Sequence, residues 1–215
     1  MKFLLFSKIS FEISDPIALI ESYCYQNDFY AKYDLLKNRK VEDVNKIGAR
    51  INKELLPKCE AVTERTKNLS IFTYNLEQFL SIDDKDRDDQ ISELNKKVIQ
   101  ELLKINGIGF SKTTKILHTL YPNIIPMFDN ALQNKYCEEI NERWTEKKSD
   151  KIFIDFYKNL NEGCNRQNLT QIFKDISKNN LRGLTKVRIF DILWWSYLKS
   201  AVLKLRENIN WSTIK

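Results

Sequence analysis

The sequence predicts an all-α fold in which amphipathic helices follow one another along almost the whole chain. Apolar residues recur at intervals of three and four in most segments, as they do on one face of a helix. Proline and helix-capping residues stand where these patterns begin or end. Hydrophobic residues make up 42% of the 215 and charged residues 30%, the balance of a globular protein. A chain of this length buries a core as one domain or as two small lobes.

The N-terminal stretch MKFLLFSKISFEI is apolar enough to suggest a secretion signal. Lys8 and Glu12 interrupt it, however, and no small-residue cleavage site follows. We interpret it as a short strand or as the lead-in to the first helix. A Ser-Asp pair before Pro16 is typical of a helix start. Residues 27–40, rich in aromatic and charged side chains, are expected to form a loop.

Two further segments define how the predicted helices are divided. Apolar residues at helical spacing predict a helix over residues 42–56 that stops at Pro57. The acidic run SIDDKDRDDQ breaks the next pattern and is expected to be a solvated loop, so that residues 81–91 form the boundary between two lobes. The expected helices cover residues 16–25, 42–56, 70–81, 91–103, 111–120, 129–140, 151–160, 167–179 and 184–205.

Composition argues against several kinds of function. No run of about 18 uncharged apolar residues occurs, so we expect no membrane span. Cys24, Cys59, Cys137 and Cys164 stand far apart without any C-x-x-C pair, which argues against zinc, an iron–sulfur cluster or any other cofactor. We interpret them as small buried residues of a cytoplasmic protein. His118 is the single histidine, expected to be structural, so His-dependent catalytic triads are excluded.

Positive charge is concentrated in the last third of the chain. Residues 151–215 hold twelve Lys or Arg against five Asp or Glu, whereas residues 1–150 hold 23 against 24. Such asymmetry favours a polyanionic partner on one face. A solvated helix face in a lysine-rich chain is the alternative. The basic stripe at near-helical spacing consists of Lys174, Lys178, Arg182, Lys186 and Arg188.

The stretch of residues 102–136 carries the strongest functional signal. Gly107-Ile108-Gly109 separates two apolar helical patterns, and two glycines so close permit positive φ and leave no Cβ in the way of a ligand. The free amides at the start of the following helix then favour an anion, aided by the helix dipole. Hydroxyl and ammonium groups suited to a phosphodiester backbone cluster there: Ser111, Lys112, Thr113, Thr114 and Lys115.

This stretch resembles the core of the helix-hairpin-helix DNA glycosylases. The pattern L-x-x-x-x-G-I-G before a helix is similar to their hairpin, and Pro126-Met127-Phe128-Asp129 to the Pro and Asp that follow it. Gly109 and Asp129 are twenty residues apart, close to the spacing in that family. A little-characterised bacterial family with the same core is similar at three further places: Tyr33-Asp34, residues 122–126 and residues 188–194.

The resemblance implies a single-domain DNA glycosylase that binds double-stranded DNA. Such an enzyme extrudes a damaged or modified nucleotide while the hairpin anchors the backbone. Asp129 would then stabilise positive charge on the sugar and orient water as the base leaves. Asp129 also stands at a predicted helix start, where a purely structural helix cap is the alternative role.

One departure from the family concerns strand cleavage. Members that also cut the strand carry a Lys two residues after the second glycine, whereas this chain has Ser111 there and Lys112 one step later. One step is a rotation of about 100° on a helix, which should point Lys112 elsewhere. We therefore expect hydrolysis without an efficient lyase step. One extra residue in the loop would restore Lys112 as a nucleophile.

The sequence specifies the base pocket and the biological role less closely than the hairpin. The candidate residues of the base pocket come from separate segments of the chain. A monomer is expected, and both DNA repair and attack on modified foreign DNA stay open. A non-catalytic DNA-binding module and a helical protein-interaction domain are the alternatives, which salt-dependent DNA binding separates. The base-pocket candidates are Tyr33, Asp34, Trp144, Arg188 and Trp194.

Overall fold

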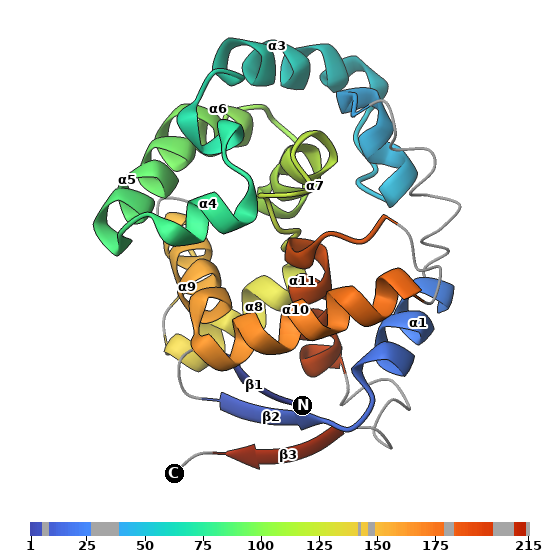
Figure 1. Cartoon of the computed structure of the whole chain (residues 1–215). Coiled ribbons are helices and arrows are strands. Elements are labelled where there is room, and N and C mark those ends of the chain that lie inside the picture. The colour runs from blue at the N-terminus through green and yellow to red at the C-terminus, as the bar shows by residue number, and fades with distance from the viewer. Residues whose placement is uncertain are drawn as a thin grey trace.

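The computed structural model describes residues 1–5, 9–26, 39–141, 143–145, 149–178, 183–199 and 209–213. Within these residues the chain is mostly helical, and one small sheet lies at the bottom of Figure 1. The helical character that the sequence predicts is therefore confirmed. No helix of the described part is long and apolar enough to cross a membrane.

The sheet joins the two ends of the chain. Strand β1 (Lys2–Leu5) pairs antiparallel with β2 (Ile9–Ile13), and β2 pairs antiparallel with β3 (Ile209–Thr213). Phe3 and Ile13 are fully buried, so β1 and β2 contribute to the core. The strand expected at the N-terminus is confirmed. The third strand was not expected, because its pairing with β2 spans almost the whole sequence and leaves no local pattern.

Helix α1 (Pro16–Gln26) begins as predicted, with the Asp15 carboxylate accepting a hydrogen bond from the Ala18 amide at 2.9 Å. The prediction of one helix over residues 42–56 is wrong. The chain forms instead the 3₁₀ helix η1 (Val41–Ile47), which ends at Gly48 with φ +77°. A short 3₁₀ turn η2 (Lys53–Leu55) and helix α3 (Leu56–Thr66) follow. Pro57 lies in the first turn of α3, where its missing N–H removes no helical hydrogen bond.

The helix predicted over residues 70–81 is divided. It forms a 3₁₀ turn η3 (Ser70–Thr73) and helix α4 (Leu76–Ser81). Asn75 begins α4, because its side chain accepts a hydrogen bond from the Gln78 amide at 2.9 Å and the Gln78 side chain accepts one from the Asn75 amide at 3.0 Å. This reciprocal cap fixes the break between the two elements.

The acidic run forms helix α5 (Asp84–Leu94), so the predicted loop is wrong and the predicted lobe boundary falls inside a helix. The Asp83 carboxylate caps α5 by accepting a hydrogen bond from the Asp86 amide at 2.8 Å. Acidic residues in the first turn also suit the helix dipole. Arg87 is 1% exposed and pairs with Asp84, which neutralises part of the negative charge.

The remaining helices agree closely with the predicted ranges. A π-helical turn η4 (Asn95–Ile99) joins α5 to α6 (Gln100–Leu103), and α7 (Phe110–Leu120) follows the glycine loop. The predicted range 184–205 is confirmed as α11 only for the part that is described, because residues 200–205 lie outside it. The later helices are α8 (Asn130–Ile140), α9 (Ser149–Asn161), α10 (Gly163–Lys178) and α11 (Lys186–Lys199).

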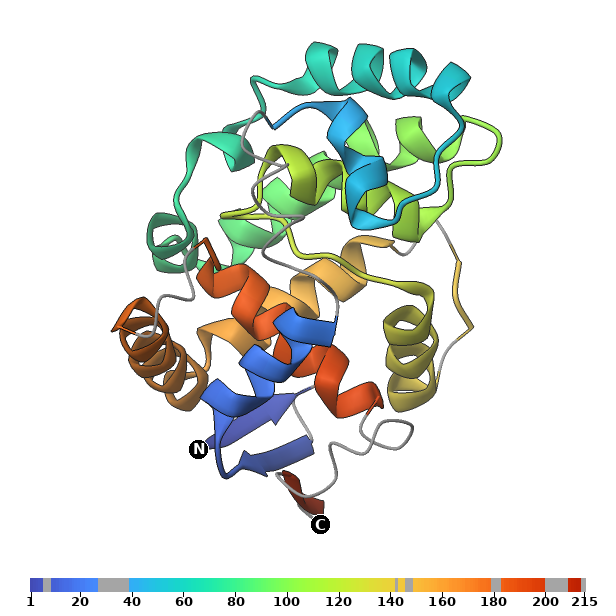
Figure 2. The same ribbon diagram turned by 90° about the vertical axis from the view of Figure 1, so that its right-hand side faces the viewer.

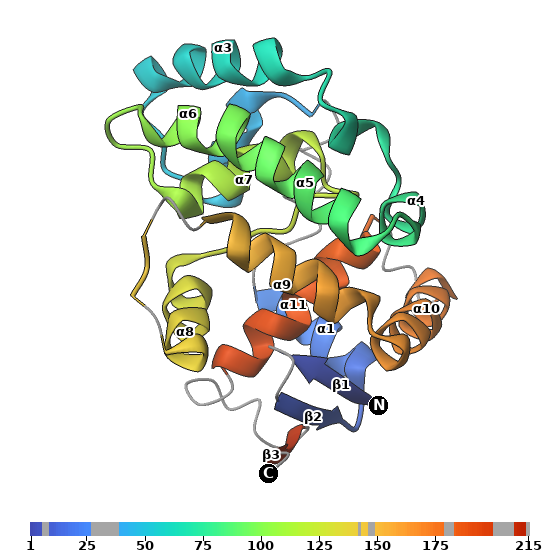
Figure 3. The same ribbon diagram turned by 90° about the vertical axis from the view of Figure 1, so that its left-hand side faces the viewer.

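Two groups of helices lie on either side of α9. Figures 1 and 3 show α3, α4, α5, α6 and α7 in one group, and α1, α8, α10 and α11 with the sheet in the other. Helix α9 contacts α5 on one side and α10 on the other. The chain enters the first group after α1 and leaves it after α7. Residues 121–129 therefore form the crossing back to the second group.

Candidate nucleic-acid interface and aspartate site

The loop between α6 and α7 presents two exposed glycines on a buried anchor. Gly107 has φ +89°, a conformation that glycine adopts without strain. Ile108 is only 3% exposed, and its amide donates to the Ile105 carbonyl at 2.9 Å. A Cβ on Gly109 would meet no atom within 4 Å, so the loop is open on that side. The loop is thus anchored in the core by Ile108, while its two glycines are accessible to solvent.

Helix α7 begins at Gly109 without any side-chain cap. The Thr113 amide is the first to bond within the helix, to the Gly109 carbonyl at 3.0 Å. The amides of residues 110–112 therefore have no partner within the helix, and the positive end of the helix dipole lies there. Phe110 holds this end in place, because it is 4% exposed and its ring packs at a tilt against the Trp144 ring, 4.6 Å between centroids.

Two lysines beside this helix start are not neutralised by carboxylates. The Lys112 ammonium donates to the Gly107 carbonyl at 2.8 Å, and the Lys115 ammonium donates to the Gly48 carbonyl at 3.2 Å. In contrast, Lys67 and Lys97 form ion pairs with glutamates one turn away. Within the described residues neither Lys112 nor Lys115 forms an ion pair, so this surface keeps its positive charge.

Of the three predicted hydroxyl contacts on α7, two face the core. Ser111 is half-buried at the helix start, where a ligand would reach it. Thr113 is fully buried, and its hydroxyl makes no hydrogen bond within the described part of the chain. Thr114 is buried as well, and its hydroxyl donates to the Phe128 carbonyl at 3.1 Å. The predictions that Thr113 and Thr114 contact DNA are therefore wrong, since both side chains point inward.

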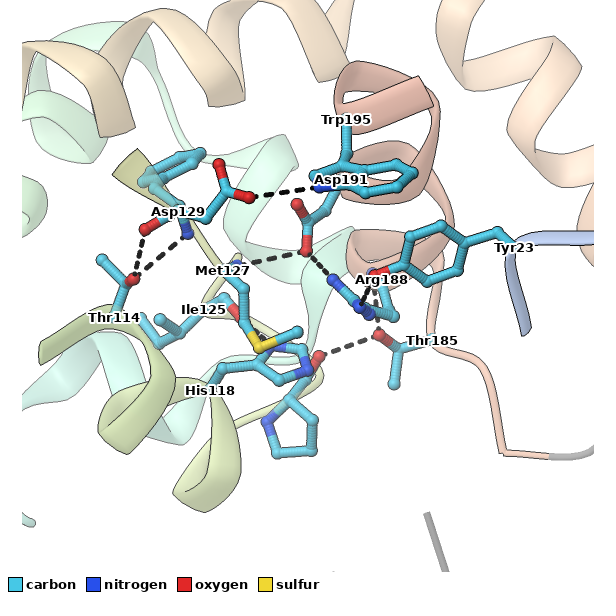
Figure 4. A network of polar contacts seen from close by, with 12 residues as sticks. Tyr23, Thr114, His118, Ile125, Met127, Asp129, Thr185, Arg188, Asp191 and Trp195 are labelled. Carbon is cyan, nitrogen blue, oxygen red and sulfur yellow. Dashed lines mark hydrogen bonds and ion pairs between the residues drawn. The ribbon is translucent and has the colours of Figure 1, made fainter. Parts of the chain in front are cut away.

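The crossing segment from Tyr121 to Asp129 is not helical and belongs to no sheet. It begins with a turn, in which the Ile124 and Ile125 amides donate to the Tyr121 carbonyl at 3.1 and 2.9 Å. Side chains of the surrounding elements make several of its other hydrogen bonds. Thr185 donates to the Pro122 carbonyl at 2.8 Å, and the Tyr157 hydroxyl donates to the Ile124 carbonyl. His118 Nδ1 lies 2.6 Å from the Ile125 carbonyl. Figure 4 shows several of these contacts around the segment.

The end of this segment is held by two further side chains. The Met127 amide donates to Asp191 Oδ2 at 3.2 Å, and the Phe128 amide donates to the Thr114 hydroxyl at 3.1 Å. The Phe128 ring is fully buried, 5.0 Å from the Phe153 ring and 5.5 Å from the Phe156 ring. The backbone directly before Asp129 is therefore fixed from α7, α9 and α11.

Asp129 caps α8 and also contacts α11. Its Oδ1 accepts a hydrogen bond from the Leu132 amide at 2.8 Å, and its Oδ2 accepts one from Trp195 Nε1 at 3.1 Å (Figure 4). The predicted structural role as a helix cap is confirmed. The carboxylate is nevertheless half-buried and not enclosed by the core. Partial burial lowers the pKa of Lys115, while the Asp129 charge opposes that effect, so the two groups lie within electrostatic reach.

A buried charged network lies behind Asp129. Arg188 forms an ion pair with Asp191 and donates to the Tyr23 hydroxyl at 2.7 Å, and all three side chains are less than 10% exposed. Burial raises the pKa of Asp191 to about 6, although the Arg188 guanidinium and the Met127 amide lower it. The two partners stand three residues apart on α11, so the ion pair forms along one face of that helix. Arg188 is thus engaged in the core, which argues against the expected direct contact with a base.

The other predicted base-pocket residues do not form one group. Trp194 is fully buried against the Phe156 and Phe190 rings, so it belongs to the core and the expected base contact is wrong in this structure. Trp144 is half-buried against Phe110. Tyr33 and Asp34 lie outside the described residues.

The predicted basic stripe is also divided. Lys186 forms an ion pair with Glu77 and lies over the Phe173 ring, 5.9 Å from its centroid, so its charge is neutralised. Arg182 lies outside the described residues. Arg166 pairs with the same glutamate, which links α4 to α10 and α11. Lys186 and Arg166 therefore link the two groups of helices and are not available to a DNA partner.

Sequence reasoning missed three residues of the site. Trp195 lies half-buried beside Asp129, and its ring packs edge-on against Tyr23 at 4.8 Å. Adjacent tryptophans on a helix predict that at least one is buried, but the pattern does not say which one. Tyr23 gives no signal, because it meets Arg188 only after the helices pack. The sequence singles out Thr114 only as a DNA contact, and its hydrogen bonds to the Phe128 backbone follow from packing that the sequence does not show.

No family model, no curated protein and no solved structure matches this chain. Among the described residues, no group of three or more His, Cys, Asp or Glu side chains is arranged to hold a metal ion. Cys24 and Cys59 are buried as expected, whereas Cys137 is half-buried and Cys164 is exposed, so the expectation of four buried cysteines is met by only two. The interpretation of the site depends on its own geometry.

The first prediction concerns the ion pair behind the aspartate. Asp191→Asn keeps an oxygen for the Met127 amide but leaves the buried Arg188 without its counter-charge. We expect the free energy of unfolding to fall by roughly 3–5 kcal/mol, the usual effect of breaking a buried pair. Glu93→Gln is the matched control, because it breaks the surface pair with Lys97 and should change stability by less than about 1 kcal/mol. Equal urea midpoints for the two variants would contradict a structural role of the pair.

The second prediction concerns acid stability. Burial, with the nearby Arg188 charge, lowers the pKa of His118 from 6.5 to about 3. The unfolded chain therefore binds more protons between these values, so stability is present above pH 6.5 and falls as the pH decreases. At about pH 5 the loss amounts to roughly 2 kcal/mol. Asp191 acts in the opposite direction, because its raised pKa favours the folded state as the pH falls below 6.

His118→Asn isolates this contribution, because an amide can still donate to the Ile125 carbonyl and does not titrate. We expect the variant to lose less stability than the wild type between pH 7 and pH 5 by about that amount. Urea denaturation at each pH measures it. Parallel curves for the two proteins would show that His118 is protonated without hindrance in the folded state.

Proposed function

We propose that this protein binds double-stranded DNA and releases a damaged or modified base by hydrolysis of its N-glycosidic bond. Lys112, Lys115 and the exposed glycine loop support the binding step, because their positive charge and the free amides of α7 suit backbone phosphates. The observation that carries the proposal is the position of Asp129. The half-buried Asp129 lies beside this positive surface, directly after a backbone segment fixed from three helices.

In the proposed reaction, one nucleotide leaves the duplex and its sugar comes to rest beside Asp129. As the bond between C1′ and the base nitrogen breaks, positive charge develops on the sugar ring. The Asp129 carboxylate stabilises that charge and orients a water molecule, which adds to C1′ and loses a proton. The base departs with its bonding electrons and takes up a proton. The products are a free base and an abasic site.

The cap contact and the proposed chemistry are compatible. The Leu132 amide holds one carboxylate oxygen, which fixes the rotation of the side chain. The Trp195 indole donates to the other oxygen and leaves its remaining lone pair free for a substrate. Groups held by packing and hydrogen bonds stabilise a developing charge best, because they need no reorganisation during the reaction.

The third prediction tests Asp129. Asn caps helices about as well as Asp, so Asp129→Asn should keep the α8 cap while losing the negative charge and the hydrogen bond from Trp195. We expect retained duplex binding and a fall of roughly 100-fold or more in base release under single-turnover conditions. The substrates are duplexes carrying damaged or hypermodified bases, scored for abasic sites. Asp83→Asn is the matched control, because Asp83 caps α5 in the same way in the other group of helices.

A second candidate function is a DNA-binding protein without catalysis. The observation that favours it is that both Asp129 oxygens already have partners, the Leu132 amide and the Trp195 indole. Under this alternative, the wild type binds duplex DNA in a salt-dependent way but releases no base from any duplex in the panel. Base release that Asp129→Asn does not slow would equally remove the catalytic role.

The fourth prediction concerns strand cleavage. The Lys112 ammonium donates to the carbonyl of Gly107, in the loop before α7, whereas Lys115 is the lysine within electrostatic reach of Asp129. We therefore expect no efficient lyase step through Lys112. Borohydride trapping on a duplex with an abasic site should give as little adduct for the wild type as for Lys112→Ala. A strong adduct that Lys112→Ala abolishes would refute this prediction.

A further inference from the structure

The loop between η1 and η2 is built rigidly around one exposed arginine. The Asn45 side chain clamps it, donating to the Ile51 carbonyl at 2.8 Å and accepting from the Ile51 amide at 2.7 Å. Ala49 and Ile51, on either side of Arg50, are 4% and 3% exposed. Arg50 itself is exposed to solvent. The loop thus holds the arginine outward on a buried base.

Arg50 contributes little to the stability of the fold. Its φ is +52°, in the left-handed region that residues other than glycine adopt at a cost. Its side chain makes no hydrogen bond and no ion pair with the described residues. Strain of this kind persists where surrounding contacts enforce it, and it concentrates at functional sites. A residue with a strained backbone, whose charged side chain has no partner among the described residues, calls for a role outside folding.

The loop lies directly beside the glycine loop of α7. At one end the Gly48 carbonyl accepts the hydrogen bond from Lys115. At the other end, Leu55 Cδ1 lies 3.5 Å from the position of a Cβ on Gly107. The Arg50 charge also lowers the pKa of Lys115, after the larger effect of burial, so the two cations are close. Figure 2 shows η1 packed against the group of helices that contains α3 and α7.

The two loops therefore form one surface with an excess of positive charge. Arg50, Lys53, Lys112 and Lys115 form no ion pair among the described residues, whereas Glu54 is the exposed acidic side chain on the segment from Gly48 to Leu55. A guanidinium matches a phosphate with two parallel hydrogen bonds, which an ammonium does not. Arg50 supplies such a fork next to the expected backbone contacts of α7.

We propose that Arg50 contacts a backbone phosphate of the DNA strand held by the glycine loop, so that the interface extends from α7 onto the loop after η1. This inference rests on the proposed DNA binding and adds a second element to it. The contact is made to phosphate and not to a base edge. Its contribution is then the same for every duplex sequence and depends steeply on salt.

The fifth prediction uses Arg50→Gly, because glycine removes the charge and also accepts the positive φ. We expect its urea midpoint to equal or exceed that of the wild type. Binding to a fluorescein-labelled duplex of mixed sequence, followed by anisotropy over a range of KCl concentrations, should weaken. The slope of log K against log salt should become shallower by about 0.9, the value for one lost phosphate contact.

Two matched variants complete the test. Arg50→Lys keeps the positive charge, so it should retain the wild-type salt slope with a modest loss of affinity. Lys67→Ala changes the net charge as Arg50→Gly does, but Lys67 is already paired with Glu64 at the end of α3, so the slope should not change. A wild-type slope for Arg50→Gly overturns the phosphate contact. A lower urea midpoint for Arg50→Gly also overturns it, because Arg50 would then serve the fold.

The wild type separates this inference from the function on which it rests. Salt-dependent binding by the wild type with an unchanged slope in Arg50→Gly removes only the Arg50 contact. Absence of salt-dependent duplex binding by the wild type removes the proposed function and the contact together.

Discussion

Beyond its first turn, the crossing from Tyr121 to Asp129 depends on hydrogen bonds that come from side chains and not from a neighbouring strand. Buried backbone amides and carbonyls without partners are costly, so a non-helical segment inside a helical protein must find donors and acceptors elsewhere. Here Thr114 and His118 come from α7, Tyr157 from α9, and Asp191 from α11. The segment therefore keeps its path only while these helices keep their relative positions.

The position of Asp129 therefore depends on how the helices pack against one another. Asp129 follows directly after the fixed segment, and its orientation combines a cap on α8 with a contact to Trp195 on α11. The buried pair of Arg188 and Asp191 is expensive to desolvate, and buried charges persist where each has a well-placed partner. In this structure the Asp191 carboxylate also holds the Met127 amide, two residues before Asp129. The contacts that pack these helices together thus also fix the position of the Asp129 carboxylate.

Local sequence patterns predicted most helices and the cap at Asp129, because apolar periodicity and capping residues act within a few positions. They failed where a local signal was ambiguous: Gly48 ends η1 early, and the acidic run is helical because Asp83 caps it and Arg87 offsets its charge. They also failed where distant segments meet. The pairing of β2 with β3, the burial of Trp194 in place of Trp195, and the approach of Lys115 to Gly48 are set by packing between helices and strands.

The distribution of partners among the basic side chains separates structural charges from available ones. Lys186 and Arg166 share Glu77 between the two groups of helices, and Arg188 is paired in the core. Lys112 and Lys115 instead donate to neutral carbonyls, which orient an ammonium without cancelling its charge. The positive charges on this surface repel one another, so binding of a polyanion would stabilise it. The half-buried Asp129 carboxylate is the acidic group whose charge acts on Lys115. Under the proposed function, an extruded nucleoside would meet both groups there.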